Sequence, residues 1–315
     1  MRSTPVPDPP AARRPRSLAE MREARGRFDN RSGRERGLAF RPRADDVLIA
    51  TAPKCGTTWV QQIVHGLRTR GSMDFAEITE AVPWLEMAAA LGLDPEGEQA
   101  ARPRAYKTHL TWEEIPKGGR YIHVTRDPRD VLVSQFRFHE GWWLEPGAVG
   151  IDEYARDQFL GPEPPGRFWT FLLSWWPRRR DPDVLFLAYE GMREDLGAAL
   201  RRIAAFIGCP LDPALEAVVL RQSSIEFMRS HAGQFDDHPV RAVLDAACGL
   251  PPGSDSSKVR RGAVGEHAAL VSPETVAALD RRWAATIGAA NGLPDYPALR
   301  GRLAAENRAT ARRRA

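Results

Sequence analysis

The sequence of 315 residues lacks the features that mark membrane, secreted and zinc-binding proteins. No stretch approaches the roughly 20 consecutive apolar residues that a membrane-spanning helix needs. The first residues are rich in proline and arginine and form no apolar signal core. The cysteines Cys55, Cys209 and Cys248 include no CxxC pair, which argues against a disulfide framework and a zinc site. We therefore expect a cytoplasmic protein that is not embedded in a membrane.

Lysine is also scarce, because arginine supplies nearly all of the 45 basic residues. The only lysines are Lys54, Lys107, Lys117 and Lys258. A lysine ammonium is a compact point charge, whereas the arginine guanidinium is a planar fork. A lysine inside a motif of this sequence therefore indicates a position that favours a compact cation.

The net charge of +4 comes from the two ends of the chain. Residues 1–43 hold 12 arginines against 5 acids, and residues 300–315 hold 6 against 1. The remaining 256 residues carry 27 basic and 35 acidic side chains, which argues against a nucleic-acid partner. We expect a flexible Arg/Pro-rich N-terminal arm over 1–43, one domain over 44–299 and a basic C-terminal tail over 300–315.

Short apolar runs at 45–51, 105–108, 121–125 and 184–189 predict buried strands. Helical periodicity follows or separates them, as in the apolar positions of 59–67. Strands that alternate with helices predict a single α/β domain with a mainly parallel central sheet flanked by helices.

The segment TAPKCGTTW at residues 51–59 predicts a phosphate-binding loop between a strand and a helix. Backbone N–H groups at a helix N-terminus bind anions, and Gly56 permits close backbone approach. Thr57 and Thr58 add hydroxyl donors, and Lys54 adds a charge. The lysine precedes the glycine, so the loop is P-loop-like but is no GxxxxGK[ST] motif, which weakens an ATPase or kinase interpretation.

A second strand–turn–helix, YIHVTRDPRDVLVS at residues 121–134, offers Arg126 and Ser134 for another phosphate. Taken alone, Arg126 could equally form a structural salt bridge. Two separate phosphate elements suit a nucleotide that is phosphorylated at both its 5′ and 3′ ends.

These motifs resemble those of the cytosolic-type sulfotransferases, which use 3′-phosphoadenosine 5′-phosphosulfate (PAPS) as donor. TAPKCGTTW is similar to the PKSGTTW loop of that family, with Cys55 in place of serine, and residues 258–266, KVRRGAVGE, resemble its RKGxxGDWK nucleotide loop. His267-Ala268 stands where the family has Trp-Lys, so the resemblance does not extend to the end of that loop. The resemblance implies PAPS as co-substrate, no metal, and these cofactor-binding residues: Lys54, Cys55, Gly56, Thr57, Thr58, Trp59, Arg126, Ser134, Tyr189, Ser223, Arg260, Arg261 and Gly262.

The segment YKTHL at residues 106–110 resembles the KTHLP segment of the family, whose histidine is the catalytic base. Side chains at i and i+2 of a strand point the same way, so Lys107 and His109 can face one site. We assign His109 as general base, Lys54 to the leaving-group oxygen and Lys107 to the sulfuryl oxygens.

Aromatic residues indicate an acceptor pocket. PWLE at residues 83–86 resembles the family's PFLE stretch, which assigns Trp84 to the acceptor, and Phe138, Trp142 and Trp143 extend the aromatic set. An aromatic pocket suits a small phenol or a hydrophobic alcohol. Trp169, Trp175 and Trp176 are expected in the core.

Two other functions stay open at this point, a P-loop-type nucleotide kinase or NTPase and a non-catalytic nucleotide-binding protein. The missing Walker A motif argues against the first, and the intact Lys54, Lys107 and His109 against the second. The family's dimerisation signature is not recognisable after Gly265, so the sequence leaves monomer and homodimer undecided.

Overall fold

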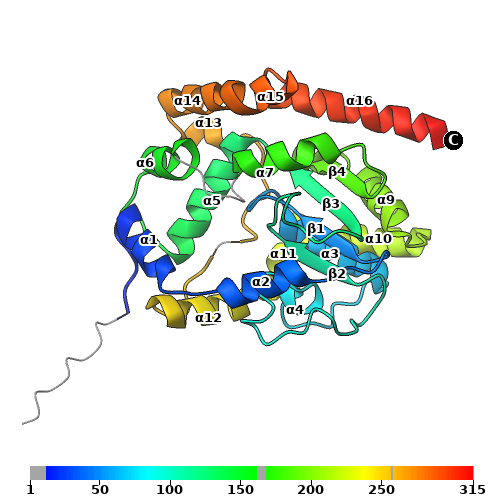
Figure 1. Ribbon diagram of the computed structural model, residues 1–315, viewed down its shortest axis with the longest axis horizontal. Helices are drawn as coiled ribbons and strands as arrows, with labels where there is room; N and C mark the ends of the chain where they lie inside the picture. The colour runs from blue at the N-terminus through cyan, green and yellow to red at the C-terminus, as the bar shows by residue number, and fades with distance from the viewer. Residues whose placement is uncertain (1–11, 162–167, 257, 315) are drawn as a thin grey trace, which may run out of the picture.

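A computed structural model of the protein describes residues 12–161, 168–256 and 258–314. Within these ranges a four-stranded parallel sheet lies at the centre, in the order β2-β1-β3-β4 (Figure 1). The strands are β1 (Val47–Ala50), β2 (Ala105–Thr108), β3 (Arg120–Thr125) and β4 (Val184–Ala188). The predicted single α/β domain with a parallel sheet is confirmed, and every predicted apolar run overlaps one strand.

Helices account for most of the remaining described chain. They are α1 (Leu18–Gly26), α2 (Arg31–Ala39), α3 (Thr57–Arg68), α4 (Ile78–Ala81), α5 (Pro128–Trp142), α6 (Ile151–Ala155), α7 (Phe168–Trp175), α8 (Tyr189–Glu194), α9 (Leu196–Ile207), α10 (Pro213–Gln222), α11 (Ile225–Ser230), α12 (His238–Cys248), α13 (His267–Leu270), α14 (Pro273–Trp283), α15 (Ala289–Asn291) and α16 (Tyr296–Arg314). Short π or 3₁₀ turns occur at η1 (Arg156–Leu160), η2 (Trp176–Arg178), η3 (Ala232–Gln234) and η4 (Ala284–Gly288).

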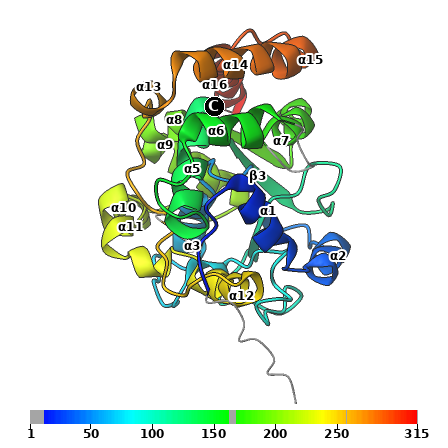
Figure 2. The same ribbon diagram turned by 90° about the vertical axis from the view of Figure 1, so that its left-hand side faces the viewer.

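Both faces of the sheet are buried, because successive residues of a strand point to opposite sides. Leu48 of β1 belongs to the apolar cluster that contains Trp175. Val47 and Ile49 belong to the other cluster, together with Val60 of α3. Helices therefore cover the sheet on both sides, as parallel sheets require (Figures 1 and 2).

The predicted motifs meet at one edge of this sheet. Loop 51–56 follows β1, His109 follows β2, Arg126 follows β3, and Tyr189 follows β4. The carboxyl ends of parallel strands share an edge, and ligands of open α/β sheets bind there. The fold thus brings together four segments that lie far apart in the sequence.

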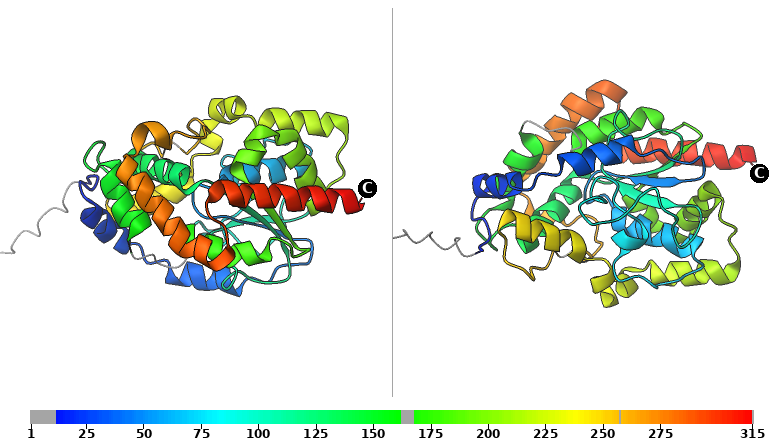
Figure 3. Two further views of the ribbon diagram at one scale, coloured as in Figure 1. Left: turned by 90° about the horizontal axis from the view of Figure 1, so that it is seen from above. Right: turned by 60° about the horizontal axis from the view of Figure 1, so that its bottom comes forward.

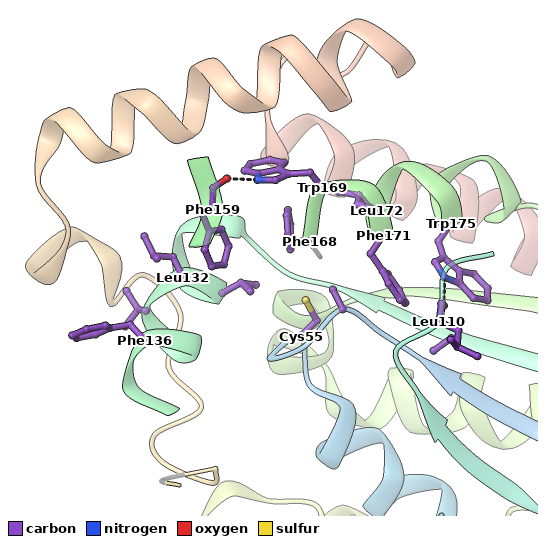
Figure 4. Close-up of a cluster of buried hydrophobic side chains, with 14 of the residues drawn as sticks. Cys55, Leu110, Leu132, Phe136, Phe159, Phe168, Trp169, Phe171, Leu172 and Trp175 are labelled. Atoms are coloured by element: carbon purple, nitrogen blue, oxygen red, sulfur yellow. Dashed lines mark hydrogen bonds between the residues drawn. The ribbon is translucent and has the colours of Figure 1, made fainter. Parts of the chain in front are cut away.

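Buried tryptophans brace the core beside this edge. Trp169, Trp175 and Trp176 are at most 1% exposed, as predicted. The Trp175 indole Nε1 donates a hydrogen bond to the Leu110 carbonyl at 3.3 Å, and Trp169 donates to the Phe159 carbonyl at 2.8 Å (Figure 4). Leu110 directly follows His109, so the core holds the backbone beside the predicted catalytic histidine.

The N-terminal segment differs from the predicted flexible arm. Residues 18–26 and 31–39 form α1 and α2, and Leu18, Met21 and Ala24 are buried in the main apolar cluster. These three residues lie on one helical face, so a narrow apolar stripe attaches a segment whose composition is dominated by arginine. The prediction of a flexible arm is wrong for the described part of 1–43, and residues 1–11 lie outside the described residues.

The predicted basic C-terminal tail is helical and packs against the rest of the domain. Residues 300–314 belong to α16, which runs along the outside of the molecule to the C-terminus (Figures 1 and 3). Leu303 is buried, and Glu306 pairs with Arg179 at 3.1 Å and with Arg180 at 2.5 Å. No helix in the described part of the chain combines the length and apolar character that crossing a membrane requires.

The burial of α1 predicts the effect of Met21→Ala. Met21 is 1% exposed, and truncating such a core side chain to alanine lowers the free energy of unfolding by about 2–5 kcal/mol. The exposed Glu23 on the same helix is the matched control. Glu23→Ala is expected to change the free energy of unfolding by less than about 0.5 kcal/mol. Urea unfolding followed by circular dichroism measures both. Equal stability of the two variants would show that α1 contributes nothing to the core.

Candidate active site

The loop between β1 and α3 is built to bring backbone N–H groups to an anion. Gly56 caps α3 with φ 102°, in the left-handed region that glycine favours. A Cβ at Gly56 would lie 3.0 Å from the Tyr189 ring, so a larger residue would clash. The hydroxyls of Thr51 and Thr57 lie 2.5 Å apart and close the loop. As at any helix N-terminus, the backbone N–H groups in the first turn of α3 have no acceptors within the helix. They lie at the positive end of the helix dipole.

A cavity of about 300 Å³ opens at this edge of the sheet. It is lined by all but one of the predicted site residues: Lys54, Gly56, Thr57, Thr58, Trp59, Trp84, Lys107, His109, Arg126, Ser134, Phe138, Trp142, Tyr189, Ser223, Arg260, Arg261 and Gly262. The exception is Cys55, whose side chain is 1% exposed in the apolar core. Burial raises the pKa of its thiol to about 12, so Cys55 acts as a small packing residue.

An aromatic pair and an arginine form one end of the cavity. Trp59 and Tyr189 meet edge to face with ring centroids 5.3 Å apart, and the Arg126 guanidinium lies 4.3 Å from the Tyr189 ring. The Trp59 indole donates to the Ser223 carbonyl at 2.8 Å. The Ser223 hydroxyl is buried without a hydrogen-bond partner, which leaves it available to a ligand.

Arg126 does not form the structural salt bridge that the sequence left open. Its guanidinium donates to the backbone carbonyls of Ala263 at 2.9 Å and Lys54 at 3.4 Å. Among the described ion pairs none involves Arg126, and its Nε is buried without an acceptor. A buried guanidinium with unused donors is suited to an incoming phosphate.

The loop over 258–267 is fastened at its far end by α5. Asp130 accepts the Gly265 backbone N–H at 2.7 Å and contacts the His267 Nδ1 at 2.8 Å. His267, which stands where the family has tryptophan, therefore anchors the loop. Glu266 pairs with Arg260, and this hydrogen bond lowers the pKa of Glu266.

His109 is oriented by the backbone of the neighbouring strand. Its Nδ1 lies 2.7 Å from the Thr51 carbonyl, which can only accept, so Nδ1 carries the proton and Nε2 is unprotonated. The His109 backbone N–H donates to Glu86 at 2.8 Å, and the Trp84 ring packs edge-on at 5.1 Å. Burial, followed by the charge of Lys107, lowers the pKa of His109 to about 3. The imidazole is therefore neutral at physiological pH.

Two lysines that line the same cavity each lie close to an aromatic ring. The Lys54 ammonium lies 4.3 Å from the Phe138 ring, and the Lys107 ammonium lies 4.3 Å from the Trp84 ring. Burial lowers the pKa of both, and burial with the charge of Lys258 brings that of Lys54 to about 7. Buried cations that are short of counter-charge favour binding of an anion.

The sequence missed several residues of the cavity. Asp237 lies between the ammonium groups of Lys107, at 3.6 Å, and Lys258, at 2.5 Å. Burial opposes its ionisation, but the two lysines outweigh that effect and lower the pKa of Asp237. Arg193 of α8 also lines the cavity. The scarcity of lysine was a signal for Lys258, whereas Asp237 and Arg193 belong to no motif.

Part of the cavity wall is aromatic and apolar. Trp84, Phe138, Trp142 and Trp143 line it, together with residues of α12. The Trp142 indole donates to Asp245 of α12 at 2.6 Å, which fixes that wall. Arg25 of α1 also lines the cavity and lies 5.6 Å from the Trp143 ring, so the segment that was expected to be a loose arm contributes to it.

The described ranges contain no group of three or more His, Cys, Asp or Glu side chains that could hold a metal ion together. The predicted independence of metal ions stays a prediction.

The fold and the cavity define an α/β protein with a cavity that is lined by basic side chains and a neutral imidazole at the carboxyl edge of a parallel sheet. The family described as "Sulfotransferase domain" matches residues 44–289. This chain therefore belongs to the sulfotransferase family, as its motifs predicted.

Relatives support this membership. Sulfotransferase 1B1 of the dog, Canis lupus familiaris, is 32% identical over 239 residues, which cover 72% of this chain and 78% of the relative. Mouse sulfotransferase SULT7A1, solved with the ligand PAP, has a TM-score of 0.62 and 22% identity over 82% of this chain and 89% of that chain. A retinol dehydratase in complex with androsterone and the inactive cofactor PAP has a TM-score of 0.61 and 21% identity, with 78% and 81% covered. At these identities, the two structures establish likeness of fold.

Proposed function

We propose that this sulfotransferase transfers a sulfuryl group from PAPS to the hydroxyl group of a small-molecule acceptor, with His109 as general base. The arrangement around His109 carries the proposal. The Thr51 carbonyl leaves Nε2 of the imidazole as its unprotonated nitrogen. Lys54 and Lys107 line the same cavity, so a base and two cations surround one space.

The donor of this enzyme is PAPS, and PAP is the nucleotide that remains when the sulfuryl group has left. Both solved structures named above contain PAP. The cavity here offers cations for the two charged ends of such a nucleotide: Arg126, Arg260 and Arg261 for the 3′-phosphate, and Lys54 with the N-terminus of α3 for the 5′ end. We assign the adenine to the remaining residues of this group, Tyr189, Trp59 and Ser223.

The reaction is proposed as an in-line displacement. The acceptor oxygen forms a bond to sulfur while the bond from sulfur to the bridging phosphate oxygen breaks, and PAP departs with that electron pair. His109 takes the acceptor proton at Nε2. Lys54 stabilises the charge that develops on the bridging oxygen, and Lys107 that on the sulfuryl oxygens. The low pKa of His109 keeps the imidazole neutral before the donor binds, and the anionic donor raises that pKa towards the range of an effective base.

The aromatic walls favour a phenol or a hydrophobic alcohol as acceptor. Trp84, Phe138, Trp142 and Trp143 line this part of the cavity. The retinol dehydratase structure contains androsterone, a ligand of the same apolar character. The proposal includes a cytoplasmic location, which rests on the sequence alone. The kinase alternative has neither a Walker A motif nor the family match in its favour.

The role of His109 is tested by His109→Ala. Loss of the general base is expected to lower kcat by about 10²–10⁴-fold, while the affinity for PAP, measured by calorimetry, changes little. The exposed His231 lies outside the residues that line the cavity, and His231→Ala is the matched control with unchanged turnover. Near-wild-type turnover of His109→Ala would remove the imidazole from the mechanism.

The role of Arg126 is tested by Arg126→Met. A charge-assisted hydrogen bond contributes about 1.5–3 kcal/mol, so the preference for PAP over AMP is expected to fall by about 10- to 100-fold. Arg129→Met is the control, because Arg129 pairs with Asp127 and is not among the cavity residues. If the wild-type protein binds ATP or ADP as tightly as PAP, the proposed donor is wrong.

The pKa of Lys54 predicts the pH dependence of donor binding. The ammonium loses its charge as the pH rises through about 7, so the affinity for PAP is expected to fall by about tenfold between pH 7 and pH 8.5. Lys54→Arg keeps the cation charged across this range, since arginine deprotonates only above about pH 12. Its affinity is therefore expected to be nearly independent of pH. If the affinity for PAP declines equally steeply with pH in both proteins, a group other than Lys54 is responsible for the pH dependence.

A further inference from the structure

Three of the four lysines of the chain line the same cavity. Lys54 and Lys107 have the roles proposed above, whereas Lys258 has none. The side chain of Lys258 is 8% exposed, and its ammonium lies 2.5 Å from Asp237. It shares Asp237 with Lys107, and both lysines line the same cavity as Lys54. Lys258 therefore belongs to the lysine cluster that the proposed function assigns to the 5′ end of the donor.

Asp237 is held so that it can bridge two of these lysines. Its Oδ1 lies 2.5 Å from Lys258 and 3.6 Å from Lys107, and it accepts a hydrogen bond from the Thr79 hydroxyl at 3.2 Å. Its backbone N–H donates to Glu77 at 3.2 Å. The backbone φ of 57° is unusual for a residue other than glycine, and such conformations concentrate at functional sites.

The charges of this cluster suit one particular group. Among the described ion pairs, Asp237 is the only carboxylate that pairs with Lys107 or Lys258, and none pairs with Lys54. The three ammonium groups therefore outnumber the carboxylates that they contact. A phosphosulfate group carries one negative charge on its phosphate and one on its sulfate. Like charges repel one another in a buried site. A third ammonium beside an ion pair with only a structural role would therefore be unfavourable.

We propose, resting on the proposed function, that Lys258 is a third donor-binding lysine that contacts the sulfuryl end of PAPS. Asp237 is the positioning residue that holds both Lys258 and Lys107 near that group. In this proposal, two ammonium groups donate hydrogen bonds to the sulfuryl oxygens. One is Lys107 of β2, and the other is Lys258 of the loop that also carries Arg260 and Arg261.

The comparison of PAPS with PAP isolates this contact. Both nucleotides carry the 3′-phosphate and about two negative charges at the 5′ end near neutral pH, but only PAPS has the sulfuryl group. For Lys258→Met we expect the affinity for PAPS, measured by calorimetry without acceptor, to fall by about tenfold or more. The affinity for PAP is expected to fall by less than about threefold. Lys258→Arg, which keeps the positive charge, is expected to recover most of the loss.

Lys117→Met is the matched control, since Lys117 is the one lysine that does not line the described cavity and hydrogen-bonds the backbone of 112 and 115 instead. It should leave the ratio of the two affinities unchanged. An equal loss for PAPS and PAP in Lys258→Met, or no loss for either, would overturn the assignment of Lys258. If the wild-type protein itself shows no preference for 3′-phosphorylated adenosine, the proposed function fails instead.

Asp237→Asn tests the positioning role. It is expected to raise KM for PAPS several-fold with little change in KM for the acceptor. In a Lys258→Met background the same change should have a smaller effect, because of the two positioning contacts of Asp237 only the one with Lys107 remains. Additive effects of the two substitutions on KM for PAPS would show that Asp237 does not act through Lys258. The thermal midpoint of each variant with saturating PAP serves as the check on folding.

Discussion

The hydrogen bond between His109 Nδ1 and the Thr51 carbonyl links the fold to the chemistry. It exists because β1 and β2 are parallel neighbours in a register that sets Ala50 beside Thr108, so the residues that follow both strands are adjacent. The same bond fixes the tautomer and directs Nε2 away from the backbone. A shift of the register by one residue would turn the imidazole to the other face of the sheet. The position and the protonation of the base thus follow from the pairing of two short buried strands.

Around this imidazole, burial disfavours the charged forms of the basic side chains. The pKa values of Lys54, Lys107 and His109 are all lowered, in each case chiefly by desolvation. Without ligand, these groups are held in an environment that disfavours their charged forms, and an anion relieves that cost when it binds. Asp237 limits the repulsion between the lysines without cancelling their charge. The binding of an anionic donor and the protonation of the site are therefore coupled.

The sequence was sufficient for those parts of the site that are local in the chain. Lys54, His109 and Arg126 each directly follow or closely follow a predicted strand, so strand pattern and parallel topology together bring them to one edge. Asp237 could not be placed in this way, because its contact with Lys107 joins segments 130 residues apart and belongs to no motif. The N-terminal helices were missed because twelve arginines over 1–43 obscured an apolar stripe, of which Met21 is the most buried member. Charge composition describes the surface of a helix and says little about the narrow face that attaches it.

The loop over 258–267 joins the two ends of the proposed donor site in one short segment. Arg260 and Arg261 stand near the proposed 3′-phosphate, while Lys258 reaches the lysine cluster at the other end. Arg126 donates to the Ala263 carbonyl, and Asp130 holds the far end of the loop. A nucleotide that orders this loop through its 3′-phosphate would therefore also fix Lys258 beside the group that is transferred. Recognition of the 3′-phosphate, remote from the reacting bond, would in this way contribute to the geometry at the sulfur atom.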